Sequence, residues 1–176
     1  MNELQTNGVG LKTTGAPSME ELHACVCYNL PGSDRTHPIA VIECIECIPC
    51  NPCETSCPQH AIHIGDEITN LPTLNMELCS GCGICVAACP GLAIYLKQKL
   101  HSQGLSLIAF PYEYYPLPIV GQAIEMVDRE GTPICKGTVL KVILVKRNDK
   151  TAIIHAAYPQ EFYEQVVNMQ RLVRTS

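Results

Sequence analysis

The stretch that decides the fold begins Cys47-Ile-Pro-Cys50-Asn-Pro-Cys53-Glu-Thr-Ser-Cys57-Pro58, and a second run follows at Cys79, Cys82, Cys85 and Cys89-Pro90. Each run has the spacing C-x2-C-x2-C-x3-C-P, and every cysteine of the first run has a counterpart 32 residues later. The similarity continues past the last cysteine, because Ala61-Ile62 is echoed by Ala93-Ile94. The two runs are an internal duplication, which indicates a repeated structural unit.

This spacing is typical of cysteines that ligate [4Fe–4S] clusters in two-cluster ferredoxins. Three cysteines separated by two residues wrap one loop around a cluster, and the fourth, followed by proline, ligates the other cluster. The spacing predicts one cluster on Cys47, Cys50, Cys53 and Cys89, and a second on Cys79, Cys82, Cys85 and Cys57. Structural zinc commonly uses separated C-x2-C pairs, and disulfide frameworks occur mainly in small secreted chains, so neither explains a duplicated run of four.

Four further cysteines lie outside the two runs. Cys44 continues the three-residue spacing backwards from Cys47; spacing alone favours Cys47 as the ligand and leaves Cys44 as a buried neighbour or spare. Cys25-x-Cys27 together with Cys44-x2-Cys47 resembles the spacing of a binuclear cluster site, which would remove Cys47 from its cubane. Ordinary buried thiols are the favoured interpretation of Cys25 and Cys27, and Cys135 is expected in the core of a strand.

Length and charge narrow the class of protein. The chain has 176 residues and a net charge of −5, which gives no electrostatic case for nucleic acid or for an anionic membrane. No apolar stretch approaches the roughly 18 residues needed to span a bilayer. The N-terminus lacks the basic and apolar regions of a secretory signal, and the many thiols favour a reducing compartment. A cytoplasmic location is therefore expected.

The expected fold is α+β: a duplicated βαβ two-cluster ferredoxin-like domain, followed by a small β-rich domain with a C-terminal helix. The expected divisions are an N-terminal arm at 1–37, the ferredoxin-like domain at 38–100, and the β-rich domain at 101–176. In the first, Ser18 and Glu21 have the spacing of a capping box. In the last, Pro159 is expected to open a helix that carries Phe162, Val166 and Met169 on one face.

Residues 111–118 read Pro-Tyr-Glu-Tyr-Tyr-Pro-Leu-Pro and are expected to form an extended linker. Three tyrosines offer large apolar faces with hydroxyl groups, so the segment is either a packed strap between domains or a docking surface for a partner subunit. His60 and His63 lie just past the first run, where a solvated role is favoured over tuning of a cluster. No phosphate loop, dinucleotide fingerprint or paired catalytic carboxylates are found, so no catalytic residue is expected.

A wider resemblance covers residues 38–156. Those that carry it are Pro38-Ile-Ala-Val-Ile-Glu-Cys44, Ile48–Pro58, Cys89-Pro-Gly-Leu-Ala-Ile94, Pro111-Tyr-Glu, Pro116-Leu-Pro118 and Asp128-Arg-Glu-Gly131. This part of the chain resembles the ferredoxin-like subunits of multisubunit flavin dehydrogenases, a family that includes complexes oxidising proline and hydroxyproline. The resemblance implies partner subunits that contain FAD, with no FAD on this chain. It also implies Cys44 as the ligand in place of Cys47.

The expected function is electron transfer by a subunit that carries two [4Fe–4S] clusters and passes electrons singly between a flavin-containing dehydrogenase and an acceptor. A free ferredoxin-type carrier is the main alternative. A protein whose clusters only maintain its shape, and an enzyme that acts alone, are the others.

Overall fold

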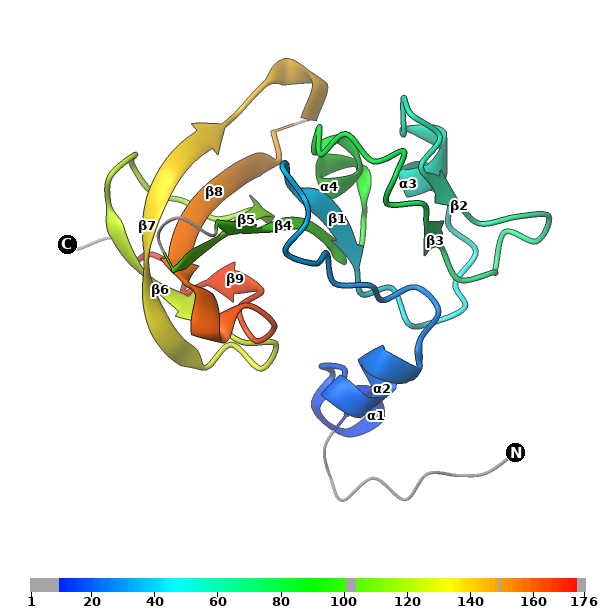
Figure 1. Ribbon diagram of the computed structural model, residues 1–176, viewed down its shortest axis with the longest axis horizontal. Helices are drawn as coiled ribbons and strands as arrows, with labels where there is room; N and C mark the ends of the chain where they lie inside the picture. Colours follow the sequence, from blue (N-terminus) through cyan, green and yellow to red (C-terminus); the bar gives the residue numbers. More distant parts are fainter. Residues whose placement is uncertain (1–9, 101–103, 149, 174–176) are drawn as a thin grey trace.

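A computed structural model describes residues 10–100, 104–148 and 150–173. Within them, seven strands form one antiparallel sheet in the order β1-β4-β5-β8-β7-β6-β9, and β2 pairs with β3 in a separate small sheet. The elements are α1 (Leu11–Thr14), α2 (Met19–Ala24), β1 (Ile39–Ile42), α3 (Pro52–Thr55), β2 (Ile62–His63), β3 (Thr73–Leu74), α4 (Ile84–Ala88), β4 (Ile94–Leu100), β5 (Leu105–Tyr112), β6 (Ala123–Val127), β7 (Pro133–Ile143), η1 (Lys146–Asn148), β8 (Ala152–Pro159), η2 (Gln160–Phe162) and β9 (Asn168–Met169). Figure 1 shows α3, α4, β2 and β3 beside one end of the large sheet, with α1 and α2 below. The architecture is mixed, as the expected α+β class requires.

The strands around the cysteine runs pair crosswise. β1, which precedes the first run, pairs with β4, which follows the second. β2, which follows the first run, pairs with β3, which precedes the second. The helices α3 and α4, each carrying cysteines, contact one another. Each half of this segment therefore obtains its strand partner from the other half.

The large sheet crosses the expected boundary at residue 100. β4 pairs with β1 on one side and with β5 on the other, so strands from 38–100 and from 101–176 share one ladder. The helix α4 contacts β4, β5 and β8. Buried apolar residues such as Ile94, Ile108 and Ile154 fill the shared core. The division at residue 100 into two domains stays a prediction.

The prediction of a C-terminal helix from Pro159 was wrong. β8 continues to Pro159, a single 3₁₀ turn follows, and Asn168–Met169 form the edge strand β9 beside β6. The amide of Val167 donates to the carbonyl of Val127, and that of Gln170 donates to Glu125, so backbone bonding to β6 replaces helical bonding. The helical pattern arose because Val166 and Met169 are both buried, which a bent segment across the sheet achieves equally well.

Smaller expectations have mixed outcomes. The capping box is present: the Ser18 side chain accepts from the Glu21 amide, and the Glu21 carboxylate accepts from the Ser18 amide at 2.7 Å. The segment at 111–118 is not wholly a linker, because Pro111 and Tyr112 end β5 and only the rest forms the loop to β6. Tyr112 is buried, whereas Tyr114 and Tyr115 are exposed.

A buried ion pair joins the hairpin between β6 and β7 to the residue before Cys44. Arg129 Nη2 lies 2.6 Å from Glu43 Oε1, and the two side chains are only 9% and 11% exposed. The hydroxyl of Tyr95 also donates to Glu43. Burial alone would lower the pKa of Arg129, but hydrogen bonds and the charge of Glu43 hold this pKa above its ordinary value. The arginine is therefore charged and paired at every physiological pH.

Lys97 on β4 lies in the same buried region. Its ammonium donates to the backbone carbonyl of Tyr163 and lies 5.2 Å from the centre of the Tyr95 ring. Burial, with repulsion from Arg129, lowers the pKa of Lys97 to about 7. Charged and polar side chains thus meet at the centre of the molecule, between the cysteine-rich segment and the C-terminal strands.

We expect Arg129→Met to destabilise the protein by about 3–5 kcal/mol, because it leaves the buried carboxylate of Glu43 unpaired. For a chain of this length that corresponds to a fall in melting temperature of about 10 °C, measurable by calorimetry. Lys136→Met is the matched control, since Lys136 lies 3.8 Å from Glu125 in an exposed pair and should contribute under about 1 kcal/mol. The double variant Glu43→Leu/Arg129→Met should recover much of the loss. Equal shifts for Arg129→Met and Lys136→Met would contradict this account of the pair.

Candidate iron–sulfur site

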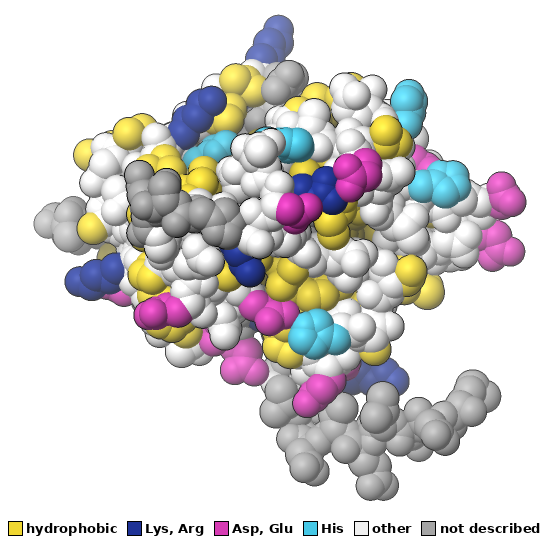
Figure 2. Space-filling model, viewed as in Figure 1, with side chains coloured by type: hydrophobic (Ala, Val, Ile, Leu, Met, Phe, Trp, Pro, Cys, Tyr) yellow, Lys and Arg dark blue, Asp and Glu magenta, His cyan; other side chains and the backbone are white. Residues whose placement is uncertain are grey.

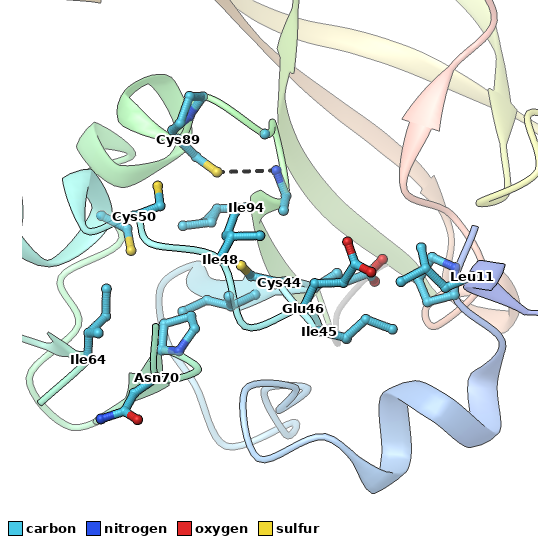
Figure 3. A pocket seen from close by; sticks show the side chains of 18 residues that line it. Leu11, Cys44, Ile45, Glu46, Ile48, Cys50, Ile64, Asn70, Cys89 and Ile94 are labelled. Carbon is cyan, nitrogen blue, oxygen red and sulfur yellow. Dashed lines mark hydrogen bonds between the residues drawn. The ribbon is translucent and has the colours of Figure 1, made fainter. Parts of the chain in front are cut away.

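A cavity of about 170 Å³ lies between the first cysteine run, β1 and the start of β4. Four cysteines border it: Cys44, Cys50, Cys53 and Cys89. In Figure 3 the sulfur atoms of Cys44 and Cys50, from the loop between β1 and α3, and of Cys89, from the end of α4, face this space. The rest of the wall is mainly apolar, with Ile42, Ile48, Ile64 and Ile94 among its residues. The arrangement fits a group larger than a single ion, held by thiolates in an apolar shell.

The residue that borders this cavity is Cys44, whereas Cys47 is exposed and is not among the lining residues. Burial raises the pKa of the Cys44 thiol, and the charges of Cys89 and Cys50 raise it further. Burial likewise raises the pKa of Cys53 to about 11, with contributions from Cys89, Cys44 and Cys50. The four thiols that border the cavity are therefore close enough for electrostatic interaction. The charge of Cys47 also raises the pKa of Cys44, so Cys47 lies near the site although it does not border the cavity.

A second cavity, of about 20 Å³, is bordered by Cys57, Cys79, Cys82 and Cys85. These are the four residues that the spacing assigned to the second cluster. Burial raises the pKa of Cys85 to about 12, and Cys79, Cys82 and Cys57 add to the effect. Thiols bind iron as thiolates, so iron bound by these four cysteines would displace their protons. Cys57 thus lies with the second run and Cys89 with the first.

The turns after Cys57 and Cys89 have the same geometry. His60 and Leu92, which occupy equivalent positions, both have positive φ, at 48° and 53°. This turn brings the amide of Ala61 to 3.3 Å from Cys57 Sγ and the amide of Ala93 to 3.4 Å from Cys89 Sγ. Hydrogen bonds to ligand sulfurs are one determinant of a cluster's reduction potential. The duplication in the sequence is therefore also a duplication of the environment of these two sulfurs.

Other candidates lie apart from both cavities. His63 is exposed, and its ring lies 2.8 Å from the Glu54 carboxylate, while His60 is exposed in its turn. The solvated role expected of both is confirmed. Cys135 on β7 is half-buried, and burial raises the pKa of its thiol to about 11. In the part of the chain that the structure describes, no three Cys, His, Asp or Glu side chains converge on a single metal ion.

The structure differs from expectation at Cys25 and Cys27, which form a disulfide. They are thus neither ordinary free thiols nor ligands of a binuclear cluster with Cys44 and Cys47. The sequence also gave no sign of the ion pair between Glu43 and Arg129, because its partners are 86 residues apart. The only local signal was that Glu43 directly precedes a cysteine.

Comparison with known proteins places a 4Fe-4S dicluster domain in this chain. A protein-family model of that description matches residues 46–93. The ABC transporter E family member 1 of Arabidopsis thaliana is 33% identical over 130 residues, which cover 65% of this chain and 21% of that protein. The chain therefore spans about a fifth of the length of this curated relative. No solved structure matches.

The dicluster match and the cysteine set support an iron–sulfur electron-carrier role. The matched span includes Cys47 and begins two residues after Cys44. The family match reports similarity of sequence. The cavity shows which thiols lie close together in space, and cluster ligation depends on that proximity. In the described residues, no helix has the length and apolar character of a membrane span.

We expect Cys44→Ser and Cys47→Ser to behave differently. Because Cys44 borders the cavity, its replacement should remove one cluster and lower the iron content from about eight to about four per chain. Cys47→Ser should retain about eight, since the Cys47 thiol is exposed beside the site. Iron analysis and electron paramagnetic resonance of the anaerobically reconstituted proteins measure both. The reverse pattern would identify Cys47 as the ligand, and two unaffected variants would mean that the thiols substitute for one another.

Proposed function

We propose that this chain is an electron-transfer subunit with two [4Fe–4S] clusters, which operates beside a flavin-containing dehydrogenase. The observation that carries the proposal is the pair of cavities, each bordered by four thiols that include cysteines of both runs. The first cluster is assigned to Cys44, Cys50, Cys53 and Cys89, and the second to Cys57, Cys79, Cys82 and Cys85. The clusters supply reversible one-electron chemistry. A reduced flavin gives up two electrons, and two clusters accept them singly.

The chain's own residues hold the two sites close together. α3 carries Cys53 of the first site and α4 carries Cys85 of the second, and these two helices contact one another. Cys53 lies on α3 and Cys57 just past its C-terminal end, yet Cys53 borders the first cavity and Cys57 the second. Neighbouring sites of this kind favour transfer of an electron from one cluster to the other. The apolar wall of the first cavity limits the access of water to the sulfurs.

Two surface features support a partner subunit. The loop between β5 and β6 exposes Tyr115, Ile119 and Val120, and Ile119 is 72% exposed. Clustered exposed apolar side chains of this kind are typical of protein interaction sites. In Figure 2, acidic side chains project where the loop between β2 and β3 forms the edge of the molecule; this loop contains Asp66 and Glu67. Ile68 of the same loop accepts a hydrogen bond from the amide of Cys50, so this acidic edge adjoins the first cavity.

The test is anaerobic purification of the tagged chain from its native cells, with mass spectrometry, iron analysis and flavin analysis of the product. We expect co-eluting chains that contain FAD and about eight irons per copy of this protein. Ile119→Ser should reduce the yield of the partner chains by roughly tenfold or more, as loss of an interface anchor does. Val173→Ser is the matched control, because Val173 is also exposed but lies outside the loop.

A solitary protein with eight irons and no flavin would overturn the subunit proposal and favour a free ferredoxin-type carrier. Partners that co-elute without flavin would overturn the flavoprotein assignment and leave electron transfer intact. The substrate class suggested by the resemblance, proline or a related amino acid, belongs to the partner's site and is tested by activity of the isolated complex.

A further inference from the structure

The disulfide between Cys25 and Cys27 is unusual in its place and size. Cys25 caps the C-terminus of α2. Only Val26 lies between the two cysteines, and their Cα atoms are 5.3 Å apart. The ten other cysteines of the chain are free thiols. Thiolates that bind clusters persist where thiols are kept reduced, and disulfides in such surroundings are mostly catalytic or redox-sensing.

A structural role explains this disulfide poorly. A cross-link stabilises a fold mainly by restricting the unfolded chain, and the effect decreases as the closed loop shortens. A link between residues two apart closes nearly the smallest possible loop. The segment is also held by other contacts, because Leu22 is fully buried and the hydroxyl of Tyr163 donates to the carbonyl of Pro31 at 2.9 Å.

A continuous buried path leads from the disulfide to the first cavity. Cys27 is 1% exposed, and a peptide bond joins it to Tyr28. The hydroxyl of Tyr28 lies 3.5 Å from Arg129 Nη2. The same Nη2 lies 2.6 Å from Glu43, and Glu43 directly precedes Cys44, which borders the cavity. Every step is a covalent bond or a hydrogen bond between buried or largely buried groups. The opposite end of the disulfide meets solvent, because Cys25 is half-buried and Val26 is exposed.

We propose that Cys25 and Cys27 form a redox-active disulfide that exchanges electrons with the clusters of the same chain. The inference rests on the two-cluster function proposed above. The disulfide takes up two electrons and two protons, its S–S bond breaks, and two thiols form. One electron comes from each reduced cluster, and the protons come from water that reaches the exposed side at Cys25. The disulfide thus stores two electrons at one site, whereas each cluster carries only one electron at a time.

The test is anaerobic coulometric titration of the full chain with both clusters assembled. Each cluster takes one electron and a disulfide takes two, so the wild type should accept about four per chain. Cys25→Ser/Cys27→Ser should accept about two. Cys135→Ser is the matched control and should still accept about four, because Cys135 lies outside the disulfide. Alkylation before and after the titration, read by mass spectrometry, should label Cys25 and Cys27 only afterwards.

Iron content and paramagnetic resonance of each variant separate the outcomes. If a sample with both clusters accepts only two electrons and its disulfide stays intact, this proposal is wrong and the two-cluster function stands. If Cys25 and Cys27 are already alkylated in the oxidised, cluster-loaded protein, the proposal is also wrong. Absence of the clusters themselves from the wild type would overturn the proposed function first.

Discussion

The structure depends on one arrangement: each cysteine run supplies its last cysteine to the site of the other run. Cys57 continues the first run but borders the cavity of the second, and Cys89 does the converse. Neither cavity is complete without the other half of the segment. The crosswise strand pairs, β1 with β4 and β2 with β3, follow from the same arrangement. A chain that binds clusters in this way links their assembly to the folding of both halves, because metal binding free energy becomes folding free energy.

The C-terminal strands extend this unit on one side only. β4 carries the sheet from the cysteine-rich segment into β5 and beyond, and the ion pair of Arg129 with Glu43 fastens the far hairpin to the residue before Cys44. A buried pair is weak evidence for net stability, since desolvation offsets much of its attraction. Its position suggests a different role, which is to fix the orientation of the backbone that presents Cys44 to the cavity. The loop with Ile119 lies in the C-terminal part, and none of its residues borders either cavity.

The parts of the fold that sequence predicts well are those with local causes. The cysteine spacing, the prolines after Cys57 and Cys89 and the capping box at Ser18 each act within a few residues. The β-rich character of the C-terminal part was predicted because β-branched and apolar residues recur there between turn signals. The segment after Pro159 was misassigned because Val166 and Met169 have helical spacing, while its hydrogen-bond partners lie on β6, about forty residues earlier. The thiol that borders the first cavity could not be chosen from spacing, because Cys44 and Cys47 differ in how the chain bends after β1.

The measurement that tests this account most directly compares four single variants by electron paramagnetic resonance of the reduced protein. Cys53→Ser and Cys89→Ser should lose the same cluster signal, and Cys57→Ser and Cys85→Ser should lose the other. The result follows if each run supplies its last cysteine to the opposite site. Loss of one signal by both Cys53→Ser and Cys57→Ser would show that each run holds its own cluster, and would contradict the exchange on which this account depends.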